Sequence, residues 1–70
     1  MPNTVQAAEM IESNIADLRE LLQGQIDLRL KFMAANEFKQ VAVMDIAITQ
    51  MEEIIAQNEL TAKQIRETAE

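Results

Sequence analysis

The chain has 70 residues, of which 49% are hydrophobic and 26% charged, with a net charge of −6 at pH 7. It contains no cysteine and no histidine, which excludes disulfide bonds and the common zinc sites. A single hydrophobic core is marginal in so short a chain, so oligomerisation remains as the means of adding stability. We therefore expect one domain, residues 1–70, that associates with further copies of itself.

The composition also bounds the class of protein. Alanine, leucine, isoleucine, glutamate and glutamine are abundant, with one glycine and one proline, which is typical of helices. No apolar run reaches the length of a membrane span, and the first residues do not resemble a signal peptide. We therefore expect a cytoplasmic location, in the host cytoplasm if the chain is viral. The acidic charge argues against direct nucleic-acid binding, which needs lysine and arginine, and permits a protein partner with a basic surface.

The first predicted helix spans about residues 4–34, with Asn3 or Thr4 as the candidate cap. Its apolar residues have the alternating three- and four-residue spacing of a helix packed along a seam, namely Ala8, Ile11, Ile15, Leu18 and Leu22. Continuing this register would place Gln25 and Arg29 in the seam. We instead expect a stutter near Gly24, after which the seam passes through Ile26, Leu30 and Met33.

The turn is expected at residues 34–37. Asn36 is the residue there that is best suited to cap the second helix, and the charge of Glu37 favours the positive end of that helix. No glycine or proline marks this turn. One continuous helix of about 65 residues in a long coiled coil is therefore the alternative.

The second predicted helix spans about residues 37–68 and has the more regular register. Its stripe comprises Val41, Met44, Ile48, Met51, Ile55, Asn58, Ala62, Ile65 and Ala69. Residues 41–48 are apolar on nearly every side, so this segment needs a partner to cover it. Asn58 marks either a polar layer that fixes the register or a frayed helix end.

These patterns predict an all-α fold, an antiparallel two-helix hairpin that assembles into a homo-oligomeric helical bundle. An antiparallel homodimer forming a four-helix bundle is the expected assembly, and a larger even-numbered assembly is the alternative. Residues 28–44 carry three bases and one acid, whereas residues 1–27 and 45–70 each carry four more acids than bases. Head-to-tail packing of two hairpins would therefore place basic turns beside acidic ends. The expected subunit contact comprises Ile26, Leu30, Phe32, Met33, Val41, Met44, Ile48, Met51 and Ile55.

Charged residues near the turn suggest two local features. Asp45 is the one acid within residues 41–48, and a buried carboxylate needs a partner. The hairpin brings Arg29 within reach, so a buried Arg29–Asp45 pair is predicted; the alternative is that Asp45 lies on an exposed strip. Arg29, Lys31 and Lys39 also converge near the start of the second helix, which is typical of an anion site. Charge complementarity between subunits is the alternative reading of these three bases.

The functional prediction follows from what the chain lacks. Without histidine, cysteine, tryptophan or tyrosine, most general-base and nucleophilic constellations are excluded, so no catalytic, cofactor or metal site is expected. The sequence predicts a non-enzymatic protein–protein interaction module that acts as an adaptor or inhibitor of another protein. One alternative is a sequestering protein that binds an anionic small molecule, such as a nucleotide, at the basic turn ends or subunit interfaces. The other is an acidic mimic of nucleic acid. The expected shape resembles small helical hairpins encoded by plasmids and phages, a likeness of fold alone.

Overall fold

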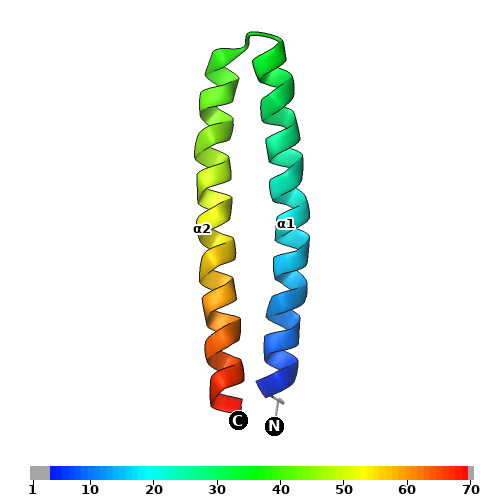
Figure 1. Ribbon diagram of the computed structural model, residues 1–70, viewed down its shortest axis with the longest axis vertical. Coiled ribbons are helices and arrows are strands. Elements are labelled where there is room, and N and C mark those ends of the chain that lie inside the picture. The colour runs from blue at the N-terminus through cyan, green and yellow to red at the C-terminus, as the bar shows by residue number, and fades with distance from the viewer. Residues whose placement is uncertain (1–3, 70) are drawn as a thin grey trace.

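The computed structural model describes the backbone of residues 4–69 and the side chains of residues 4–68. It consists of two helices, α1 (Thr4–Ala34) and α2 (Phe38–Ala69). They lie side by side and antiparallel, joined by a short turn, so that the start of α1 and the end of α2 lie together (Figure 1). The predicted all-α hairpin is confirmed and the continuous long helix is excluded. Of the two candidate caps, Asn3 lies outside the described residues, and Thr4 is the first residue of α1 itself.

The turn is made by a left-handed residue that ends α1. Asn36 has a φ of 59°, and its N–H donates to the carbonyl oxygen of Met33 at 3.1 Å. The N–H of Glu37 donates to the carbonyl oxygen of Phe32 at 2.9 Å. Together these bonds form a Schellman motif, which tolerates asparagine at the left-handed position.

The prediction that Asn36 caps α2 is therefore wrong. A capping residue needs an extended backbone, and Asn36 is left-handed instead. Glu37 takes the place at the start of α2, because its carbonyl oxygen accepts the first α2 bond, from the N–H of Val41 at 3.1 Å.

One seam of alternating spacing joins the helices along their length. Its buried members are Ala8, Ile15, Val41, Ile55 and Ala62. Half-buried side chains continue the same spacing between them, on α1 at Ile11, Leu18, Leu22, Gln25, Arg29 and Phe32, and on α2 at Met44, Ile48, Met51, Asn58 and Ile65. The register predicted for α2 is thus confirmed as far as Ile65. The helix is continuous through Asn58, which excludes a frayed end there.

The stutter predicted near Gly24 does not occur. α1 is helical through Gly24, and a Cβ placed there would meet nothing within 4 Å. Leu30 and Met33, predicted to enter the seam, are 57% and 38% exposed, whereas Gln25 and Arg29 lie in it. The prediction failed because it excluded long polar side chains from the seam. An arginine can lay its aliphatic stem along apolar surface while its charged end reaches outward.

The hairpin leaves more surface in water than a compact chain of its size. It measures 52 × 14 × 14 Å, and its radius of gyration is 16.0 Å, against about 11 Å for a compact domain of this length. Its accessible surface is 5292 Å², against about 4,400 Å² for a typical folded monomer of its mass. Among the described residues, no large side chain is fully buried.

Replacing Gln25 with leucine is expected to stabilise the hairpin. The Oε1 atom of Gln25 is buried with no hydrogen-bond partner among the described residues. Such an acceptor costs about 1–3 kcal/mol, so Gln25→Leu should raise the free energy of unfolding by about 1 kcal/mol or more. Chemical denaturation followed by circular dichroism measures the change.

A matched control is Gln23→Leu on the same helix. Gln23 is exposed and donates only to Asp27, at 3.0 Å, so its replacement should change stability by less than about 0.5 kcal/mol. A fall in stability for Gln25→Leu would contradict the conclusion that the Gln25 oxygen is unpaired.

Candidate functional site

The two sides of the seam differ in charge. One side, here the charged flank, carries Glu12 and Arg19 of α1, followed towards the turn by Ile26 and Met33, and Asp45, Glu52, Glu59 and Arg66 of α2. The other, here the uncharged flank, carries Asn14, Leu21 and Leu28 of α1 and Ala47, Ile54 and Thr61 of α2. Within each helix the members of a flank repeat at multiples of seven residues, so each set forms a row beside the seam. The hairpin therefore presents two chemically distinct sides.

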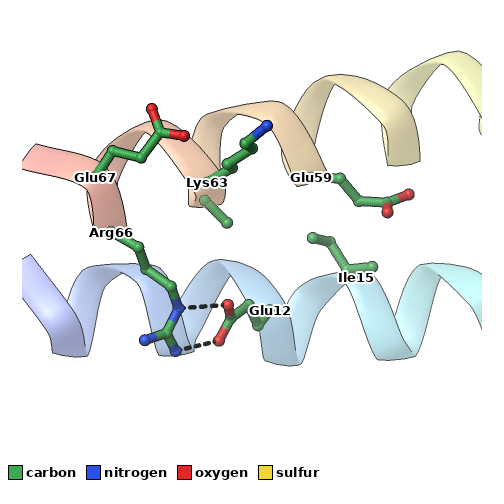
Figure 2. A pocket seen from close by; sticks show the side chains of 7 residues that line it. Glu12, Ile15, Glu59, Lys63, Arg66 and Glu67 are labelled. Carbon is green, nitrogen blue, oxygen red and sulfur yellow. Dashed lines mark hydrogen bonds and ion pairs between the residues drawn. The ribbon is translucent and has the colours of Figure 1, made fainter.

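An ion pair with two hydrogen bonds joins the helices near their open end (Figure 2). The Nε atom of Arg66 donates to Oε2 of Glu12 at 2.7 Å, and Nη2 donates to Oε1 at 2.6 Å. The hydrogen bond from Arg66 lowers the pKa of Glu12, and the same bond raises the pKa of Arg66, because each partner favours the charged form of the other. Both side chains remain nearly half exposed.

A second pair lies one heptad nearer the turn, with the charges exchanged between the helices. The Nη2 atom of Arg19 on α1 donates to Oε1 of Glu59 on α2 at 3.0 Å. If the helices slid by one heptad, Glu12 would face Glu59, and two acids would meet. Interhelical charge pairs set register and orientation in coiled coils. The charged flank thus favours the observed register of the two helices over the register shifted by one heptad.

An open hollow of about 440 Å³ lies beside these pairs (Figure 2). It is lined by Glu12, Ile15, Glu59, Ala62, Lys63, Arg66 and Glu67. Ile15 and Ala62 belong to the seam, while the other five lining residues are charged. None of the seven is a hydroxyl or thiol nucleophile, and the Glu12 carboxylate is held by Arg66. Among the described residues, no group of three acids is placed to hold a metal ion.

The structure brings Arg29 and Asp45 together. The Nε atom of Arg29 donates to Oδ1 of Asp45 at 2.5 Å. In the single chain the two side chains are 32% and 54% exposed, so the pair lies at the surface and is not buried. A surface ion pair contributes about 0–1 kcal/mol, far less than a buried one can cost or gain.

The three bases of the predicted anion site are not joined into one site. Arg29 is engaged by Asp45, whereas Lys31 lies in the last turn of α1 and Lys39 in the first turn of α2. Among the described residues, the side chains of Lys31 and Lys39 make neither a hydrogen bond nor an ion pair. Anion binding at the turn end stays a prediction.

The nine residues predicted for a subunit contact fall into two groups. Six lie in the seam against the other helix of the same chain, namely Phe32, Val41, Met44, Ile48, Met51 and Ile55. Ile26 lies beside the seam and is half-buried, while Leu30 and Met33 are exposed. The chain itself therefore covers much of the surface that was assigned to a partner.

Sequence reasoning missed the uncharged flank. Leu21, Leu28 and Ile54 on it are 59%, 42% and 49% exposed. A row without charge, in a chain in which 26% of residues are charged, is visible in the sequence once the heptad register runs through Gln25 and Arg29. With the expected stutter near Gly24, Leu21 and Leu28 would not lie in the same row. These apolar side chains do not amount to a membrane span, since neither described helix has an apolar stretch long enough to cross a bilayer.

The Glu12–Arg66 pair predicts a dependence of stability on pH. Arg66→Gln should lower the melting temperature at pH 7, because Glu12 loses its hydrogen-bond donor. Arg66 lowers the pKa of Glu12 from 4.5 in the folded chain, so the stabilisation is present above pH 4.5 and is lost as the pH falls through the lowered pKa. The difference in melting temperature between wild type and Arg66→Gln should therefore shrink as the pH falls below 4.5.

The control for this titration is Lys63→Gln, which removes the same charge one turn away on α2. Lys63 makes no ion pair within the described residues. For Lys63→Gln, the difference in melting temperature from the wild type should not shrink comparably as the pH falls. Thermal unfolding by circular dichroism from neutral to strongly acidic pH measures both, and a gap for Arg66→Gln that is constant with pH would contradict the assignment.

The Arg29–Asp45 contact predicts a small coupling energy. Arg29→Ala and Asp45→Ala, made singly and together, form a double-mutant cycle. Because the pair is exposed, we expect a coupling of about 0.2–1 kcal/mol in the free energy of unfolding. Additive single effects would show that the contact contributes nothing, and a coupling of several kcal/mol would show that the pair is buried in the protein as it exists in solution.

Comparison with known proteins adds no further assignment. No model of a protein family, no curated protein and no solved structure matches this chain. The function must therefore be argued from the geometry of the hairpin and the chemistry of its two flanks.

Proposed function

We propose that the chain is a non-enzymatic protein–protein interaction module that self-associates into a helical bundle. The observation that carries this proposal is the surface area of the single chain. Its accessible surface of 5292 Å² exceeds that of a typical folded monomer of its mass by about 900 Å². Each partner in a standard protein–protein interface buries about 800 Å². The excess is thus about the amount of surface that one stable contact removes from water.

The kind of surface supports the same proposal. Among the described residues, eleven large hydrophobic side chains are exposed, against five hydrophobic residues that are buried. Fully burying one such side chain contributes about 1.5–3 kcal/mol, so a second layer of helices that covers some of them adds to the stability that the single seam supplies. Two hairpins packed together make a four-helix bundle, the simplest arrangement that provides this layer. Head-to-tail packing places the basic turn of one copy beside the acidic open end of the other.

The assembly then acts as an adaptor or inhibitor of another protein. The net charge of −6 per chain leaves an acidic outer surface, which suits a partner with a basic surface and makes that binding sensitive to salt. The exposed acids on α1 and α2 lie on rigid helices, which fixes their spacing for such a partner.

Two other functions remain as proposals of lower rank. The side chains of Lys31 and Lys39 lie beside the turn and have no partner within residues 4–68, which supports sequestration of an anionic small molecule such as a nucleotide. The acidic surface supports mimicry of nucleic acid. A rise in melting temperature on adding nucleotide favours the first, and competition by DNA for a shared protein partner favours the second.

The proposal predicts that the protein is not a monomer in solution. Sedimentation equilibrium and light scattering should give a mass of at least two chains of 7.9 kDa each. Dilution should lower the melting temperature, because folding and association are coupled in a small oligomer. A mass of one chain with a melting temperature independent of concentration would contradict the proposal.

A further inference from the structure

We infer that the uncharged flank is the surface on which a second copy of this chain docks. This inference rests on the proposed self-association and names the face that performs it. The flank consists of Asn14, Leu21, Leu28, Ala47, Ile54 and Thr61, three residues from each helix.

The position of the flank in the heptad supports this role. The core of a four-helix bundle is built from the two seam positions of each helix plus one flanking position. In this hairpin the charged flank bears ion pairs between the helices, so the uncharged flank is the position left for the core. Ala47 and Thr61 on it are half-buried already, while Leu21, Leu28 and Ile54 project into solvent. A second hairpin would cover these three side chains.

Electrostatics selects the same side. Two copies that each carry a charge of −6 repel one another. Contact through the charged flank would bring the Glu12–Arg66 and Arg19–Glu59 pairs of one copy against those of the other, and would take eight charged groups out of water. Contact through the uncharged flank keeps both sets of pairs in solvent on opposite outer sides of the dimer.

The uncharged surface reaches the size of a small specific interface. The six residues of the flank span residues 14–28 of α1 and 47–61 of α2, and the same heptad position is also uncharged at Ala7, Gln40 and Thr68. From Gln40 to Thr68 this row is about 42 Å long on a hairpin 14 Å wide, so it offers on the order of 600 Å² per copy, or about 1,200 Å² in total, at the lower end of specific interfaces. The other exposed apolar residues of the described chain are spread over several other heptad positions and both halves of the hairpin, so they do not form one row; they are Val5, Met10, Leu30, Met33, Phe38, Val43, Ile46 and Leu60.

The test compares one substitution at two positions of α2. Ile54 lies on the uncharged flank and is 49% exposed, and Ile46 lies on the outer face and is 62% exposed. Ile54→Lys should weaken self-association by about 100-fold or more, because each dimer loses two buried isoleucines and gains two charges in the contact. Ile46→Lys, the matched control, should leave the association unchanged within about threefold. Sedimentation velocity over a concentration series measures both.

The outcomes separate this inference from the proposal on which it rests. If the wild type sediments as a monomer, both fail. If the wild type self-associates and Ile54→Lys associates equally well, or Ile46→Lys is the variant that dissociates, the uncharged flank is not the contact while self-association stands. Loss of association in Ile54→Lys alone supports the inference.

A second measurement keeps the inference testable if Ile54→Lys does not fold. The chain has no cysteine, so single thiols can be placed at Leu21 on the uncharged flank and at Leu30 on the opposite side of α1. These side chains are similarly exposed in the single chain, at 59% and 57%. In the self-associated protein, the thiol of Leu21→Cys should react with a maleimide at least about tenfold more slowly than that of Leu30→Cys, since a residue in a packed contact is released only by dissociation. Equal rates, or slower reaction at position 30, would overturn the assignment.

Discussion

The structure depends on one constraint, which is that two helices lying side by side can bury only one stripe of each. The two helices account for nearly all of the described residues, and no third element among these covers the remaining faces. Within the described chain, the seam collects five buried hydrophobic residues, and none of the large ones is fully removed from water. The rest of the apolar content must face outward. The extended shape, the large accessible surface and the expected self-association all follow because the outer apolar faces of the two helices are not covered by another element.

The seam itself is a compromise between apolar packing and specification of a single register. Gln25, Arg29 and Asn58 occupy positions that apolar residues would fill more favourably. Arg29 is compensated by Asp45, whereas the Oε1 atom of Gln25 has no partner among the described residues. Polar residues in a helical seam commonly cost stability and restrict the alternatives for pairing. Along the charged flank, the exchanged polarity of Glu12–Arg66 and Arg19–Glu59 adds a second restriction on register.

The two flanks differ in charge, and this difference makes only one of them suited to contact with a second copy. On the charged flank, ion pairs join the two helices of one chain, so these charged side chains are already paired within the hairpin. The other side carries apolar and uncharged polar residues without such pairs. A module arranged in this way can associate through one flank and keep its acidic groups in solvent for a different protein. No chemistry beyond binding is required of any side chain in this scheme.

The sequence by itself determined the helical class, the two-helix organisation, the position of the turn and the register of α2, because these depend on local propensity and on a regular spacing of apolar residues. It also brought Arg29 and Asp45 within reach of each other, since the turn position fixes which residues lie at the same level. The tertiary structure decided what local rules could not. Asn36 ends α1 rather than capping α2, because the two backbone bonds of the Schellman motif require a left-handed residue there. Gln25 and Arg29 stay in the seam. An unbroken heptad register in α1 keeps the packing against α2 continuous, and this stabilises the hairpin more than two polar seam residues destabilise it. Because the heptad register of α1 is unbroken, Leu21, Leu28 and Ile54 lie on one uncharged flank.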